Sequence, residues 1–242
     1  MEEFHNNLHL RYGLTPAALP KSCDGCGAPF LVDHALLCKK GALIMIRHND
    51  LVAEWHDLCA KAFTPGAVSD EPFIHSCLDT PGTATPTPAP LPETRGDVAV
   101  HGFWKRGTTA IFDVRITDTD APSYRGMEPQ KAIAHQETAK KDKYVPPCLE
   151  RCRHFTPLVF SVDGLRGVEA TAACRRVASC LAKKWQRPYS ELCGYVRSRI
   201  SLALARTTSL CLRGPRDHSN RLPRPPGMTD GAPLGIFPRV ES

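Results

Sequence analysis

The chain has 242 residues and a formal net charge of +6, and 23% of its residues are charged. Such a length suits one or two domains and is sufficient to bury a hydrophobic core. The sequence has 11 cysteines but shows neither a signal peptide nor an apolar run that could cross a membrane. We therefore exclude a membrane-spanning class and expect an intracellular, reducing setting in which thiols stay free or bind metal.

Positive charge is concentrated in the second half of the chain. Residues 151–213 contain twelve Lys and Arg residues against three acids, whereas residues 1–150 are slightly acidic. A local excess of positive charge predicts a surface that binds a polyanion.

Residues 1–22 show no clean hydrophobic period. Pro16 and Pro20 divide this stretch into short pieces. We predict a packed lead-in segment rather than a domain.

A run of zinc-ligand residue types occupies residues 23–40. The ligand types are Cys23, Cys26, His34 and Cys38. The first two cysteines flank a glycine-containing turn, and a helix starting near Asp33 would place the histidine and the last cysteine on one face. This spacing predicts a tetrahedral zinc knuckle. The alternative is four unrelated buried residues.

Residues 41–63 have apolar side chains close to the 3.6-residue period of an amphipathic helix. Arg47 and His48 lie side by side within it. Such a pair on a helix forms a solvated face or an ion pair, or contacts phosphate. Further along, residues 80–93 are rich in Pro and Thr and predict an extended, disordered loop.

The central stretch, residues 95–144, predicts a hairpin that carries two acids. Asp97 opens a short apolar run, a Lys-Arg-Gly turn follows, and Asp113 lies in a second apolar run. Two carboxylates facing each other across a hairpin are hard oxygen ligands for a divalent cation such as Mg²⁺. The alternative is a surface hairpin with solvated charges.

Three lysines follow the hairpin and are candidates for stabilising negative charge at a phosphate. They are Lys140, Lys141 and Lys143. On a helix, the first and third lie nearly on one face, whereas the second is turned away by about 100°. Only one of the three needs to act at the site.

The last third of the chain alternates between strand and helix patterns. Residues 155–163 form a continuous apolar run typical of a buried strand, and residues 167–185 have helical spacing. A final helix is predicted from about Ser190 to about Leu212, and its basic positions Arg197 and Arg199 are predicted to contact backbone phosphate. Residues 214–242 are rich in Pro and Gly and predict a disordered tail.

The order of these motifs resembles the restriction-like, PD-(D/E)xK endonuclease of early-branching, site-specific non-LTR retrotransposons, which follows a Cys-Cys-His-Cys knuckle. Lys140, Lys143 and Tyr144 match the family's Lys-x-x-Lys-Tyr ending, and Arg47 with His48 resembles a pair on its first nuclease helix. The resemblance covers approximately residues 10–213.

The resemblance implies a DNA endonuclease that nicks target DNA to prime reverse transcription in the nucleus. Asp97 and Asp113 would hold Mg²⁺, and Lys140 would stabilise charge at phosphorus. The implied partners are DNA and a reverse transcriptase domain or element RNA, although no polymerase motif is present in this chain.

The chain departs from the family pattern at two positions. Gly96 stands where Pro is expected, and Arg115 stands where a standard nuclease carries an in-strand Lys. These departures favour two alternatives: a zinc-dependent nucleic-acid-binding module whose catalytic site has decayed, or a retroelement remnant without activity.

The expected architecture is an α/β domain with a mixed sheet of four or five strands, helices on both faces and an N-terminal zinc knuckle. The expected segments are a lead-in at 1–22, a knuckle at 23–40, an endonuclease domain at 41–213 and a tail at 214–242.

Overall fold

A computed structural model describes residues 2–75 and 94–216. The chain divides into two compact units. We name Met1–Trp55 with Arg199–Ser242 the knuckle unit, and His56–Ser198 the sheet unit. The division falls within two long helices, at residues 55–56 and 198–199.

Four helices contribute to the knuckle unit. They are α1 (Glu2–Arg11), α2 (Val32–Leu37), α3 (Leu43–Ala62) and α6 (Tyr189–Arg213), and the last two continue into the sheet unit. The predicted helix at 41–63 is confirmed as α3, and the predicted last helix as α6. Helix α1 was not predicted, because it has no apolar stripe and is positioned by polar contacts: Asn7 donates to the Ala205 carbonyl at 2.8 Å.

The sheet unit contains a mixed four-stranded sheet, as predicted. Its strands are β1 (Val68–Asp70), β4 (Val98–His101), β5 (Thr109–Thr117) and β6 (His154–Ser161), in the order β1-β4-β5-β6. The first two pairings are antiparallel and the third is parallel. A separate antiparallel pair joins β2 (Phe73–His75) to β3 (Thr94–Arg95).

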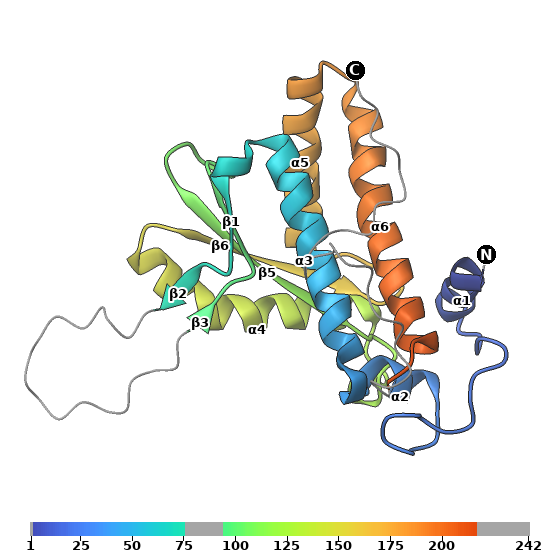
Figure 1. Ribbon diagram of the computed structural model, residues 1–242. Coiled ribbons are helices and arrows are strands. Elements are labelled where there is room, and N and C mark those ends of the chain that lie inside the picture. The colour runs from blue at the N-terminus through green and yellow to red at the C-terminus, as the bar shows by residue number, and fades with distance from the viewer. Residues whose placement is uncertain (1, 76–93, 217–242) are drawn as a thin grey trace, which may run out of the picture. The chain divides into compact units, whose positions relative to one another are not determined.

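Helix α4 (Pro129–Glu150) connects the parallel strands β5 and β6 and lies along the sheet (Figure 1). A crossover of this kind is needed because parallel strands cannot be joined by a tight turn. The helix buries Tyr144 and Cys148 against Ala99 and Ile111 of the sheet. One face of the sheet is therefore sealed by α4.

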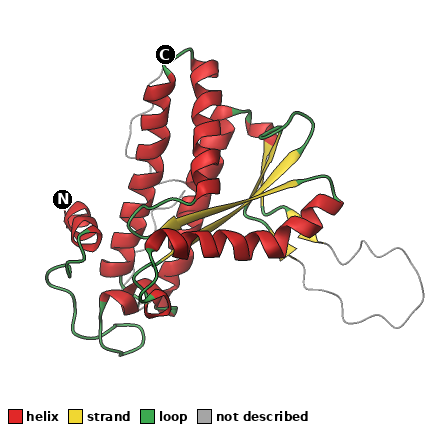
Figure 2. Ribbon diagram, turned by 180° about the vertical axis from the view of Figure 1, so that it is seen from behind, coloured by secondary structure: helices red, strands yellow, loops and turns green. Residues whose placement is uncertain are grey.

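The opposite face is covered by aromatic residues and α5 (Val168–Trp185). The ring of Phe103 lies 4.7 Å from that of Phe112 on β5 and 5.3 Å from that of Phe63, measured between centroids. Arg176 of α5 donates to the Phe103 carbonyl at 2.8 Å. Helices thus flank the sheet on both sides, which confirms the predicted α/β class (Figure 2).

Two predictions fall mainly outside the described residues. The predicted loop at 80–93 lies wholly outside them, and so does the predicted tail apart from residues 214–216. Within the part of the chain that the structure describes, every helix is too short or too polar to traverse a bilayer.

Candidate functional sites

The four predicted zinc ligands converge in the knuckle unit. Ligand atoms of Cys23, Cys26, His34 and Cys38 all lie within 4.8 Å of one another. The turn between the first two cysteines is closed when the Gly27 amide donates to the Cys23 carbonyl at 2.8 Å. Gly27 has a φ of +74°, a conformation that glycine adopts without steric cost.

The sulfur spacing matches a tetrahedral zinc site. Cys38 Sγ lies 3.9 Å from Cys23 Sγ and 4.0 Å from Cys26 Sγ, and Cys26 Sγ lies 3.3 Å from His34 Nε2. Two sulfurs bound to one tetrahedral zinc at about 2.3 Å each stand roughly 3.8 Å apart. The cluster could therefore hold a zinc ion with little rearrangement.

The thiols of the knuckle differ in acidity. Burial raises the pKa of Cys23, but hydrogen bonds involving His34 and the amides of Gly25 and Cys26 outweigh burial and lower that pKa to about 6. A hydrogen bond at the Ala28 backbone lowers the pKa of Cys26, but burial and the neighbouring sulfurs raise it above its ordinary value. The lowered pKa of Cys23 favours the thiolate, the form that binds metal.

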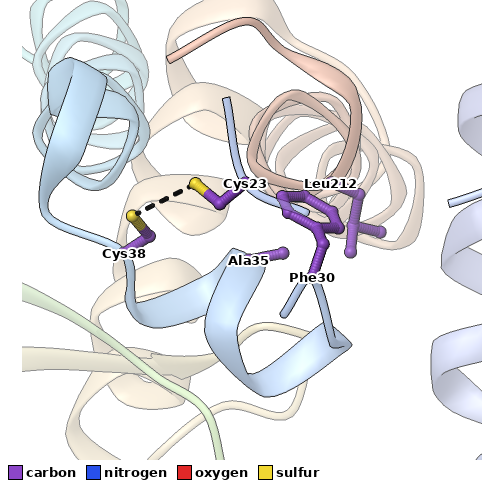
Figure 3. Packing of buried hydrophobic residues seen from close by; sticks show 5 residues of the cluster. All are labelled: Cys23, Phe30, Ala35, Cys38 and Leu212. Carbon is purple, nitrogen blue, oxygen red and sulfur yellow. Dashed lines mark hydrogen bonds between the residues drawn. The ribbon is translucent and has the colours of Figure 1, made fainter. Parts of the chain in front are cut away.

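The knuckle packs on the end of α6. Figure 3 shows Phe30 beside Leu212, with the sulfurs of Cys23 and Cys38 facing each other nearby. Just after α6, the buried Arg216 donates its amide to the Asp24 carboxylate at 2.6 Å. Its guanidinium donates to the Ala35 carbonyl at 2.9 Å, so one residue ties both halves of the knuckle to the helix end.

Arg47 does not occupy the position predicted for a phosphate contact. Its side chain is 3% exposed and donates to the Leu36 carbonyl at 3.4 Å. Because that carbonyl is in α2, Arg47 links α3 to the knuckle instead of facing solvent. His48, its neighbour, is half-buried.

Arg199 also differs from its predicted role. Its Nε lies 2.5 Å from Glu54 Oε1, and the two side chains are 21% and 9% exposed. The pair joins α6 to α3 within the knuckle unit, so the Arg199 charge is already neutralised. Arg197, by contrast, is exposed.

The two predicted acids occupy opposing positions of the β4–β5 hairpin. Val98 pairs with Phe112, so the next position outward places Asp97 opposite Asp113. Asp97 accepts a hydrogen bond from the Val114 amide at 2.6 Å, which directs its carboxylate at the strand that carries Asp113. The hairpin therefore places the two predicted metal ligands opposite each other.

Lys140 reaches Asp113 from α4. Its Nζ lies 2.5 Å from Asp113 Oδ2, and the two side chains are 19% and 9% exposed. The pairing follows from the helix period and the strand alternation: Tyr144, one turn after Lys140, packs with Ile111, which shares a strand face with Asp113. The same packing that seals the sheet thus directs the lysine at the acid.

The other two lysines are placed as the predicted helix phase requires. Lys141 forms an ion pair with Glu169 on α5 instead of approaching the acids. Lys143 lies over the ring of Tyr144, 4.7 Å from its centroid.

The two departures from the family pattern have distinct environments. Gly96 donates its amide to the Pro72 carbonyl at 2.9 Å, and a Cβ at this position would lie 2.5 Å from Ile111 Cγ2. Proline could neither donate that hydrogen bond nor fit that space. Arg115 is exposed, whereas the ion pair with Asp113 is formed by Lys140 of α4.

Sequence reasoning missed the role of Glu137. This buried residue of α4 accepts the Glu169 amide at 3.0 Å and so caps the first turn of α5. Burial raises the pKa of Glu137 above its ordinary value. The capped helix begins after Gly167, which supplies no side-chain cap, and a glycine before a helical pattern was the available signal.

No model of a known protein family and no curated protein sequence matches this chain.

Proposed function

We propose that the chain is a metal-dependent DNA endonuclease of the PD-(D/E)xK type, with a structural zinc knuckle, as in site-specific non-LTR retrotransposons. The observation that supports this most is that Asp97, Asp113 and Lys140 come together on the side of the β4–β5 hairpin that α4 covers. Asp97 directly precedes β4, Asp113 lies in β5 and Lys140 lies in α4.

The donor set fits Mg²⁺, because carboxylate oxygens are the ligands that this ion prefers. Asp97 and Asp113 would hold it, and a bound Mg²⁺ would activate water and polarise a phosphate. The carboxylates fix the ligand positions, since Asp113 is almost buried and Asp97 is held by the Val114 amide. Lys140 places a cation next to Asp113, where it would lie beside the negative charge that develops on phosphorus.

The sequence departures are compatible with this proposal. Gly96 replaces a proline at a position where the fold uses the amide hydrogen and leaves no room for a side chain. The lysine function is supplied from α4, so Arg115 is not required to replace an in-strand lysine. Zinc at the knuckle would stabilise the knuckle unit instead of taking part in cleavage.

A second candidate is a nucleic-acid-binding module that no longer cuts. It is favoured by the partners that the two acids have within the protein: Asp113 forms an ion pair with Lys140, and Asp97 accepts a hydrogen bond from the Val114 amide. Two carboxylates that served only to bind a metal would repel each other in the metal-free protein, and partners within the protein offset that repulsion. In both cases we propose DNA as the partner, a nuclear location, and an association with a reverse transcriptase domain or element RNA.

The deciding experiment is nicking of supercoiled plasmid DNA in Mg²⁺ or Mn²⁺. The wild-type protein should nick, and Asp97→Asn and Asp113→Asn should each abolish nicking while leaving the zinc content unchanged. A wild-type protein that binds DNA but never nicks it would refute the endonuclease and leave the binding module.

A further inference from the structure

A small cavity in the sheet unit lies where three arginines meet. Its volume is about 220 Å³, and it is lined by residues of the loop before α5, of α5 itself and of the first turns of α6. Ligand pockets for larger molecules are about 300–1,000 Å³. The cavity is therefore of a size that suits a small polar group.

The lining residues carry positive charge without compensation. Arg166, Arg175 and Arg197 all line the cavity, and no Asp or Glu is among its lining residues. Within the described residues, none of the three forms an ion pair with a carboxylate. Arginine is permanently protonated, so these three charges repel each other unless an anion lies between them.

Each arginine is supplied by a different segment. Arg166 is fixed by a backbone bridge to Phe160 at the end of the sheet and contacts the thiol of Cys174. Arg175 is exposed on α5 and Arg197 is exposed on α6, so both guanidinium groups are free to reorient toward a ligand. Convergence from three segments is a property of the tertiary fold and not of a local cluster of basic residues.

Hydroxyl groups complete the set of hydrogen-bond donors. Thr171 and Tyr189 line the same cavity, and Tyr189 is hydrogen-bonded with Cys193. Guanidinium forks and hydroxyl groups are the side-chain donors that bind phosphate oxygens, and arginine does so in a bidentate manner. A cation would be repelled by the three guanidinium groups.

We propose that this cavity binds a phosphate group, carried either by a nucleic-acid strand or by a small phosphorylated molecule. The site is separate from the acids of the β4–β5 hairpin and does not depend on cleavage activity. If the phosphate belongs to DNA, the cavity fixes one backbone position of the bound strand through Arg197, whereas Arg199 is already paired with Glu54.

The test is calorimetric titration of the full chain with inorganic phosphate. In the double variant Arg175→Gln/Arg197→Gln, phosphate should bind more weakly by about tenfold or more. The matched control, Arg106→Gln/Lys183→Gln, removes the same charge from exposed positions outside the cavity and should stay within about twofold of wild type. Arg175→Lys/Arg197→Lys keeps the charge but loses the fork, and should give intermediate affinity.

Two further titrations distinguish the sources of the phosphate. If the double glutamine variant loses affinity for a short DNA duplex and its salt dependence becomes shallower, the phosphate belongs to a strand. If only adenosine monophosphate binding is lost, the phosphate belongs to a small molecule; either result supports the site. A wild-type protein that does not bind phosphate, or a control variant that loses as much affinity, would overturn it. Asp113→Asn should still bind phosphate, which separates this proposal from the nuclease.

Discussion

Lys140 of α4 and Asp113 of β5 form an ion pair one helical turn from the packed pair Tyr144 and Ile111. The ion pair and the hydrophobic contact lie on the same two elements, so the packing of α4 sets the position of the ammonium group. A side chain positioned in this way needs little reorganisation to act at a bound phosphate. This arrangement makes the lysines of α4 the sharpest test of the proposed chemistry.

Lys140→Ala should lower the nicking rate by about 10²–10³-fold, a loss typical of removing one group that stabilises transition-state charge. The matched variant is Lys141→Ala, because Lys141 pairs with Glu169 and not with the acids. It should change the rate by less than about threefold, since Lys141 does not approach the acids and its half-exposed ion pair with Glu169 contributes little to stability. Single-turnover rates on supercoiled plasmid provide the measurement, and equal losses in the two variants would contradict the assigned roles.

Zinc should be bound in about one equivalent and should stabilise the knuckle unit. Cys26→Ser should lose the metal and lower the melting temperature, because the remaining ligands leave the tetrahedron incomplete. Cys152→Ser is the matched control, since Cys152 is an exposed free thiol outside the cluster. Metal analysis combined with thermal melting measures both effects.

Acidification should release the zinc, because protons compete for the thiolates and for the imidazole. A wild-type protein that purifies without metal, and whose melting temperature does not rise when zinc is added, would show that the cluster is four packed side chains and not a metal centre.

The knuckle and the acidic hairpin could be predicted from the sequence because both are local. Ligand spacing within Cys23–Cys38 and the acids of one hairpin depend on turns and strand register, which nearby residues determine. The roles of Arg47 and Arg199 could not, because each depends on a partner from another segment: the Leu36 carbonyl and Glu54. A basic residue on a helix has the same pattern whether it faces solvent or a buried acceptor.

Gly96→Ala should destabilise the sheet unit. The added methyl group would lie 2.5 Å from Ile111 Cγ2, so the strand or that side chain must shift. A cost of about 1–3 kcal/mol is expected from overpacking of this kind. Gly96→Pro should cost more, because it also removes the hydrogen bond to the Pro72 carbonyl.

Urea denaturation of these variants measures the effect, with Gly66→Ala as the control because a Cβ there meets no atom within 4 Å. If Gly96→Pro were as stable as wild type, the explanation given for the missing family proline would be wrong.

Glu137 should make the stability of the sheet unit depend on pH in a defined direction. Burial raises the pKa of Glu137 in the folded protein above its ordinary value of 4.5. The folded state therefore holds this proton more tightly than the unfolded state does. The stabilisation is fully present below pH 4.5, and it is lost as the pH rises from 4.5 through the raised folded-state pKa.

The variant Glu137→Gln keeps an oxygen that can accept the hydrogen bond from the Glu169 amide, but its side chain cannot titrate. The free energy of unfolding of wild type minus that of Glu137→Gln should therefore fall over this pH window and level off above it. Glu150→Gln is the control, because it makes the same substitution at an exposed position of the same helix. Urea denaturation across this window measures both differences, and a wild-type advantage over Glu137→Gln that grows with rising pH would contradict the proposed burial effect.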